Sequence, residues 1–146
     1  MPIVGFNFSK VYVEKKITKV EEKLKIQIRN DVLITNVEEE KLPTGKSKAD
    51  GLKFDFKFSL RYEPGVGEVE LLGFVYYLDE VEVIKTIYKN WKKDKKIPQE
   101  ITENIVNTVL LKGSVKALSL AQEVNLPPHL ALPVVSPKAS PETYIG

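Results

Sequence analysis

The chain has 146 residues, a net charge of +2 and no cysteine. This length suits one domain with a single core, and the lack of cysteine excludes disulfides, thiolate catalysis, cysteine zinc sites and iron–sulfur clusters. No apolar run approaches the roughly 20 residues of a membrane-spanning helix, and the first residues lack a signal peptide's basic start and apolar stretch, so we expect a soluble, cytoplasmic protein.

The first predicted strand covers residues 5–15. Phe6 and Phe8 lie at one parity, whereas Val11 and Val13 lie at the other. Because alternate side chains of a strand point to opposite faces, the apolar face must switch near Ser9-Lys10, as a bulge or a strand covered on both faces would explain.

Three further strands are predicted before residue 79. Residues 23–38 alternate, with a bend expected at Asn30-Asp31, and residues 52–62 alternate most cleanly. An exposed, mobile loop is expected between these two strands, from Glu40 to Gly51, because it contains Pro43, Gly45 and Gly51.

The fourth strand, residues 68–78, follows a turn at 63–67 and is apolar on both faces. It therefore needs cover on both faces. The protein's own helices would supply one cover, and a subunit, a ligand or a client protein the other.

The second half predicts two helices. An amphipathic helix should begin near Asp79-Glu80 and end before Pro98, and a longer one should cover residues 99–122. The longer helix has a stripe at four-residue spacing that we expect to form an oligomer interface, because its small members allow another backbone to approach. The stripe consists of Ile101, Ile105, Val109, Gly113, Ala117 and Ala121.

Five prolines after residue 126 exclude a regular helix or a central strand there. We expect residues 126–135 to form an ordered extended arm and residues 136–146 to form a mobile tail, so that the domain is 1–135.

Catalytic and metal chemistry find no support in the sequence. His129 is the one histidine and has no carboxylate within five residues, so neither a hydrolytic triad nor a metal cluster is indicated. We predict no enzyme activity, no catalytic or metal-binding residue and no cofactor. An enzyme whose site is assembled from distant carboxylates or lysines stays open, and would show strongly shifted pKa values in a polar pocket.

Six lysines give residues 85–96 a charge of +5, with Asp94 alone opposing them. Such a helix face could bind phosphates, with Tyr88 or Trp91 stacking on a base. The helical period places both aromatic residues among the apolar positions instead, so a solvated lysine face is the commoner explanation. A nucleic-acid-binding module remains an alternative.

Three segments resemble the SecB family of export chaperones. They are Phe6 to Lys15, Gly67 to Val75, and the end of the long helix with Asn125-Leu126-Pro127-Pro128 and Ala131-Leu132-Pro133. The resemblance implies a four-stranded antiparallel sheet of Greek-key type with helices on one face, a tetramer built as a dimer of dimers, and ATP-independent holding of unfolded chains. It also implies an export or toxin–antitoxin partner. SecB proteins are acidic, whereas this chain is slightly basic, which puts the export partnership in doubt.

The sequence therefore predicts an α+β protein with a four-stranded antiparallel sheet, two amphipathic helices and a proline-rich arm. The preferred function is an ATP-independent holdase that binds extended polypeptide in apolar grooves; a purely structural homo-oligomer, dimer or tetramer, is the other alternative. The expected groove residues are aromatic, aliphatic or proline: Phe6, Phe8, Tyr12, Leu72, Phe74, Tyr76, Trp91, Leu126, Pro127, Pro128 and Leu130.

Overall fold

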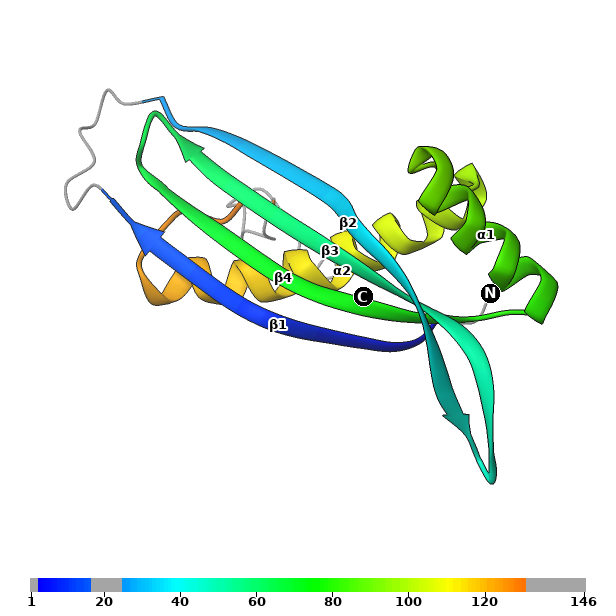
Figure 1. Ribbon diagram of the computed structural model, residues 1–146. Helices are drawn as coiled ribbons and strands as arrows, with labels where there is room; N and C mark the ends of the chain where they lie inside the picture. The colour runs from blue at the N-terminus through cyan, green and yellow to red at the C-terminus, as the bar shows by residue number, and fades with distance from the viewer. Residues whose placement is uncertain (1–2, 17–24, 131–146) are drawn as a thin grey trace, which may run out of the picture.

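A computed structural model describes residues 3–16 and 25–130. In chain order the elements are β1 (Ile3–Lys15), β2 (Gln27–Thr44), β3 (Ser47–Glu63), β4 (Gly67–Leu78), α1 (Val81–Asp94) and α2 (Gln99–Glu123). The strands form one antiparallel sheet in the order β1-β4-β3-β2 (Figure 1). Because β1 lies beside β4 while β2, β3 and β4 follow one another, this is a Greek key. The predicted α+β class, sheet and helix order are confirmed, whereas residues 131–135 of the arm and the tail 136–146 lie outside the described part.

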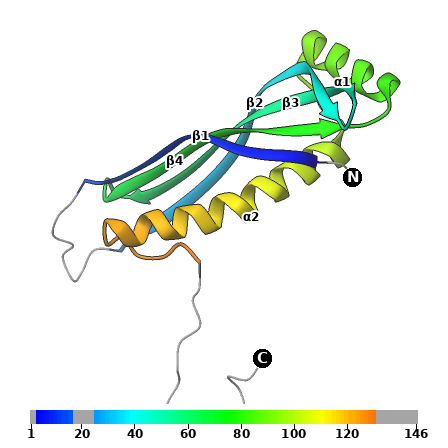
Figure 2. The same cartoon turned by 90° about the horizontal axis from the view of Figure 1, so that it is seen from below.

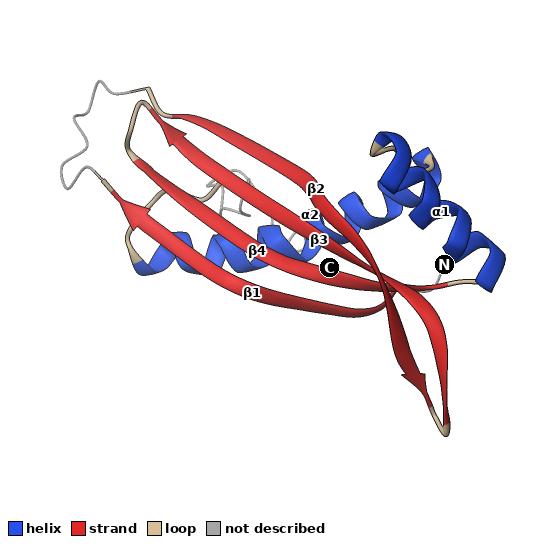
Figure 3. Ribbon diagram, in the orientation of Figure 1, coloured by secondary structure: helices blue, strands red, loops and turns tan. Residues whose placement is uncertain are grey.

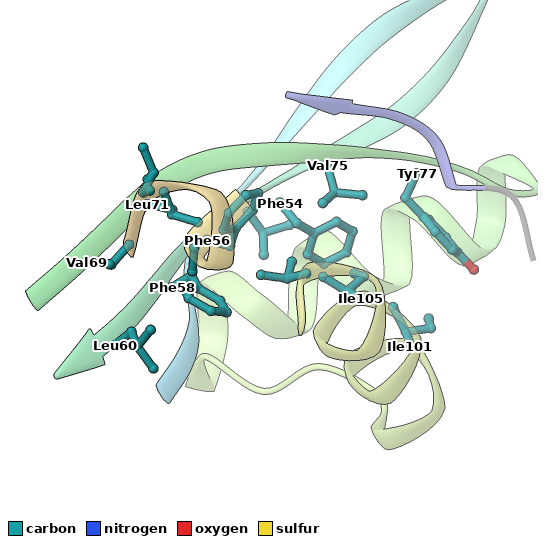
Figure 4. Packing of buried hydrophobic residues seen from close by; sticks show 14 of the residues in the cluster. Phe54, Phe56, Phe58, Leu60, Val69, Leu71, Val75, Tyr77, Ile101 and Ile105 are labelled. Carbon is teal, nitrogen blue, oxygen red and sulfur yellow. The ribbon is translucent and has the colours of Figure 1, made fainter. Parts of the chain in front are cut away.

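The core lies against one face of the two central strands. The even-numbered side chains of β3, from Leu52 to Tyr62, are all buried, as are the odd-numbered residues of β4, from Gly67 to Tyr77. Figure 4 shows Phe54, Phe56 and Phe58 packed between the sheet and the long helix. The strict period of two in β3 therefore encodes a single buried face, as its sequence predicts.

The two edge strands each contain a register shift. In β1 one shift lies between Ile3 and Gly5 and a second between Phe8 and Lys10. The second confirms the predicted switch of the apolar face at Ser9-Lys10 as a bulge. In β2 the strand continues through Asn30-Asp31, where we expected a bend, and the shift occurs between Ile34 and Asn36. That expectation was wrong because Asn30 and Asp31 keep regular pairing with Leu60 and Ser59.

The predicted loop from Glu40 to Gly51 is instead the tip of a long β2–β3 hairpin, which projects beyond the other strands in Figure 1. Paired residues continue to Thr44 and Ser47, and Gly45 takes a positive φ of 72° in the turn. Pro43 is tolerated because β2 is an edge strand, where a missing N–H costs no ladder hydrogen bond. The turn is therefore confined to Gly45 and Lys46, and the rest of the segment belongs to the two strands.

The helices begin and end where the sequence predicts. Asp79 accepts hydrogen bonds from the Tyr77 hydroxyl and the Glu80 N–H, both at 2.7 Å, immediately before α1. Lys95 ends α1 in the left-handed conformation, and Pro98 is the residue before α2. Figures 2 and 3 show α2 running along one face of the sheet, where it contacts all four strands. The buried residues of both helices join the same core cluster as the even-numbered face of β3.

Candidate functional site

Apolar side chains lie on the sheet face opposite α2, which we call the outer face. It carries the even-numbered residues of β4, of which Leu72, Phe74 and Tyr76 are half-buried. The Phe74 and Tyr76 rings lie 5.2 Å apart, and Lys53 Nζ lies 4.6 Å from the centre of the Phe74 ring. The second apolar face that the sequence predicts for β4 is therefore partly exposed to solvent.

Charged groups of both signs border this apolar row. Glu70 accepts a hydrogen bond from Lys10 Nζ at 2.7 Å, and Lys57 Nζ lies 3.1 Å from its other oxygen. These two contacts hold the pKa of Glu70 below its ordinary value. Desolvation by burial raises the pKa of Asp55, despite the opposing effect of Lys53. The charges compensate each other locally, so the outer face has no strong field of one sign.

The helix side of β1 carries a second apolar region. The Phe6 ring lies 5.1 Å from Phe8 and 5.2 Å from Phe56, and Lys112 Nζ lies 5.2 Å from the centre of the Phe6 ring. On the same side of the strand Val11 is 44% exposed. The edge of the core is therefore only partly covered at β1.

Some predicted groove residues share a surface and others do not. Tyr12, Leu72, Phe74 and Tyr76 belong to the outer face, because Tyr12 pairs with Glu70 and Lys10 with Leu72. Phe6 and Phe8 pair with Val75 and Gly73, which places them on the opposite face. Trp91 lies in α1 and is largely buried.

The arm residues lie at the end of the sheet near the β3–β4 turn. Leu126 is buried beside Gly67, and the Tyr62 hydroxyl donates a 2.7 Å hydrogen bond to the Pro127 carbonyl, while burial raises the pKa of Tyr62. Pro128 and Leu130 are exposed. The eleven residues thus occupy four separate places, of which the outer face is one continuous row.

The stripe assigned to an oligomer interface packs within the chain. Ile105, Val109, Ala117 and Ala121 are fully inaccessible, and Gly113 faces Phe58, so the close approach is to the protein's own sheet. The opposite side of α2 carries Leu111 and Val115, which are 70% and 65% exposed and which the sequence reasoning missed. Their four-residue spacing is the signal that could have identified them. Leu33 on the outer face, 59% exposed, was missed as well.

Metal-ligating side chains form no cluster in the part of the chain that the structure describes. No group of three or more His, Asp or Glu residues there is arranged to hold a metal ion. Burial lowers the pKa of His129, and among the described residues neither of its ring nitrogens has a hydrogen-bond partner. Neither described helix has the length and apolar content needed to cross a membrane.

Comparison with solved structures shows a likeness of fold. No family model and no curated protein matches the chain. The fold is similar to that of the Mycobacterium tuberculosis SecB-like chaperone Rv1957, solved in complex with a ChAD peptide from the Rv1956 HigA1 antitoxin. The two are 11% identical, with a TM-score of 0.50 over 94% of this chain and 92% of that chain. The SecB-like resemblance seen in three sequence segments is therefore confirmed for the fold.

Proposed function

We propose that this protein is an ATP-independent holdase that binds unfolded or extended polypeptide. The observation that carries the proposal is the apolar row Leu72, Phe74 and Tyr76 on the outer face, which no described helix of the chain covers. Exposed apolar patches commonly mark interaction sites. Leu33 is a further exposed apolar side chain on this face, separated from Leu72 by Lys57 of β3. The chain is then a binding protein without a catalytic role.

The chemistry of this surface suits clients of varied sequence. Apolar contact is non-directional, so it selects for exposed hydrophobic side chains rather than for one sequence. The neighbouring ion pairs Lys10–Glu70 and Lys57–Glu70 leave little net charge to select clients by sign. The likeness to a chaperone solved with an antitoxin peptide supports polypeptide as the ligand.

Assembly and partners belong to the same proposal. We infer a cytoplasmic homo-oligomer, a dimer or tetramer, whose partner is an export or toxin–antitoxin component. Leu111 and Val115 lie one turn apart on α2 and are both exposed. They support self-association, because neighbouring exposed apolar side chains commonly mark a surface that another chain covers.

The nucleic-acid alternative is less well supported. Trp91 is buried, and Lys92 Nζ lies 5.1 Å from the centre of the Tyr88 ring, so neither aromatic residue presents an open face for a base. The lysines of α1 are nevertheless exposed, and a non-specific phosphate contact would depend steeply on salt.

Light scattering tests the proposal. A reduced, chemically unfolded client is diluted into buffer with and without the protein, in the absence of ATP. Suppression of aggregation that persists in moderate salt is expected, together with a molar mass above that of one chain. An oligomer that leaves aggregation unchanged would instead support a purely structural scaffold.

A pair of variants ties the effect to the outer face. Because a buried aromatic side chain contributes about 1.5–3 kcal/mol, Phe74→Ser should weaken client holding by about tenfold or more. Val81→Ser is the matched control, since Val81 is exposed at the start of α1. Equal holding by both variants would refute the assignment of the outer face.

A further inference from the structure

Helix α1 carries a row of lysines on its solvent side. Lys85, Lys89 and Lys93 are spaced four residues apart, so they leave neighbouring points on one side of the helix, over a length of about 12 Å. All three are exposed, and we call them the lysine row. Figures 1 and 2 show this helix at the end of the molecule that also holds the β2–β3 hairpin. The side of α1 that packs on the core consists of Ile84, Ile87 and Trp91.

No carboxylate among the described residues forms an ion pair with the lysine row. The four ion pairs of the described structure all lie before α1 in the chain. Asp94 is the one acidic residue of the segment 85–96, and it accepts a hydrogen bond from the Lys96 N–H at 3.1 Å, at the end of the helix. Lys92 and Lys95 are not counted in the row, because they line a pocket between β2 and α1 whose β2 wall carries two carboxylates.

The spacing of the row costs the helix stability. Residues three and four positions apart are neighbours on a helix surface, and like charges at such positions are unfavourable. Lys89 has Lys85 four positions before it and Lys92 and Lys93 after it, so three of its four such neighbours are lysines. A cation in the last turn of α1 interacts favourably with the helix dipole, but this effect does not extend to Lys85 or Lys89. The folding of α1 therefore gives no reason for the row.

A chain of phosphates is the partner that best complements the lysine row. A line of ammonium groups on a rigid helix attracts polyanions, and binding releases the counterions that a nucleic acid condenses. Base pairing holds the phosphates of a duplex in place, whereas a flexible acidic peptide loses conformational entropy when it follows the row. An anionic membrane fits less well, because a helix that lies on a membrane inserts an apolar face, and the apolar face of α1 is buried in the core.

The aromatic residues of α1 favour a duplex over a single strand. Proteins that bind single strands stack the bases on aromatic side chains. Trp91 is 8% exposed, and the Nζ atoms of Lys92 and Lys95 lie over the Tyr88 and Trp91 rings, at 5.1 and 5.0 Å from the ring centres. Neither ring of α1 is therefore open to a base, and contact with phosphates is the mode of binding that the helix allows.

We infer that the lysine row is a docking site for the phosphate backbone of double-stranded nucleic acid, without selection for base sequence. This surface is additional to the outer face and does not depend on the holding of polypeptides. Three phosphate contacts per chain imply that the logarithm of the binding constant falls by about 2.7 for each tenfold rise in salt. Affinity should therefore fall about 40-fold between about 50 and 200 mM salt.

Fluorescence anisotropy on the full chain tests the inference. The probes are labelled DNA and RNA duplexes of about 20 base pairs, and binding to either supports the docking site. Two DNA duplexes of unrelated sequence should bind equally well, with the predicted salt dependence. A single-stranded oligothymidylate of the same length should bind more weakly. The emission of Trp91, the chain's one tryptophan, should stay unchanged because no base reaches the indole.

Two pairs of substitutions locate the site. Lys89→Gln with Lys93→Gln should weaken duplex binding at least fivefold at low salt and reduce the salt slope by about 2. Lys46→Gln with Lys48→Gln is the matched control, because it removes the same charge from exposed positions of the hairpin at the same end of the molecule, and it should change binding by less than twofold. The first pair relieves contacts between like charges, so it should leave Tm unchanged or raise it.

Several results would overturn the inference. Equal weakening by the two pairs would mean that net charge, and not the row, controls binding. Absence of duplex binding at low salt would exclude the site, and a single strand that binds as tightly while shifting Trp91 emission would exclude the duplex mode. Stronger binding of polyglutamate or of phosphatidylserine vesicles would assign the row to an acidic protein or to a membrane. Suppression of client aggregation is measured in parallel and should be unchanged in both pairs, so the docking site and the holdase function stand or fall separately.

Discussion

The contact between Gly113 and Phe58 gives a quantitative test of how α2 is held on the sheet. A Cβ atom added at Gly113 would lie 2.6 Å from Phe58 Cδ2 and 2.9 Å from Cε2. Both distances are well below van der Waals contact, and Phe58 is fully buried, so its ring has no free space to enter. Gly113→Ala therefore forces either the helix or the ring to move.

The expected cost follows from two opposing effects. Alanine favours the helix by about 1 kcal/mol over glycine, whereas overpacking a well-packed core costs about 1–3 kcal/mol. Because both contacts fall below 3 Å, we take the upper part of that range and expect a net loss of about 1–2 kcal/mol. For a chain of this length, that loss corresponds to a fall in Tm of about 3–6 °C.

Thermal and urea unfolding followed by circular dichroism would measure the loss of stability. Ser119→Ala, at an exposed position of α2, is the matched control and should change stability by less than about 0.5 kcal/mol. In a Phe58→Leu background the penalty should disappear, leaving the helix preference of alanine visible as a gain of up to about 1 kcal/mol.

The same variant separates packing within the chain from packing between chains. Light scattering at matched concentrations should give Gly113→Ala the molar mass of the parent protein, because Gly113 faces Phe58 of its own chain. A rise in Tm would refute the overpacking argument. Unchanged stability with a reduced molar mass would instead indicate that Gly113 lies in an oligomer interface, as the sequence analysis expected.

Three further variants have distinct expected outcomes. Gly73→Ala should destabilise the protein by about 3 kcal/mol or more in urea unfolding, because the new Cβ would collide with the Asn7 carbonyl of β1 and with the Phe56 ring. Gly45→Ala is the comparison, since its Cβ meets open space and the only strain comes from the positive φ; an equal loss of stability in the two variants would contradict the collision argument. Glu70→Gln should cost about 0.5 kcal/mol at pH 7, since Lys10 and Lys57 lower the pKa of Glu70 but the pair is partly solvated. That contribution is present above the ordinary pKa of 4.5 and is lost as pH falls through the lower folded-state pKa, so parent and variant should converge in stability at low pH; a constant difference down to pH 2 would count against it. Leu111→Ser with Val115→Ser should leave Tm within a few degrees of the parent and lower the molar mass in light scattering, and an unchanged molar mass would exclude this helix face from assembly.

Local periodicity determined most of the secondary structure. The alternation from Leu52 to Tyr62 encodes one buried face of β3, and the parity switch at Ser9-Lys10 encodes the bulge in β1. Pro98 and the acidic pair Asp79-Glu80 mark the helix starts. These features depend on near neighbours along the chain, so a sequence read without its fold can reveal them.

Tertiary pairing decided what the sequence left open. Glu40 to Gly51 looks like a loop by composition, yet it is strand because each side of the hairpin supplies the other's backbone partners. The stripe that includes Gly113 looks available for another chain, but Phe58, 55 residues earlier, fills the space beside it. The candidate groove residues divide between two sheet faces, α1 and the segment after α2. On the sheet, the β1 bulge and the strand order set which side chains become neighbours.

The sequence alone thus determined most of the strand and helix positions and that β4 carries apolar residues on both faces. The tertiary structure decided which of those residues are covered, and it created the pocket between β2 and α1 from segments about 50 residues apart. The physical reason is that burial and pocket shape depend on contacts between distant segments, whereas local structure depends on the spacing of side chains along one segment.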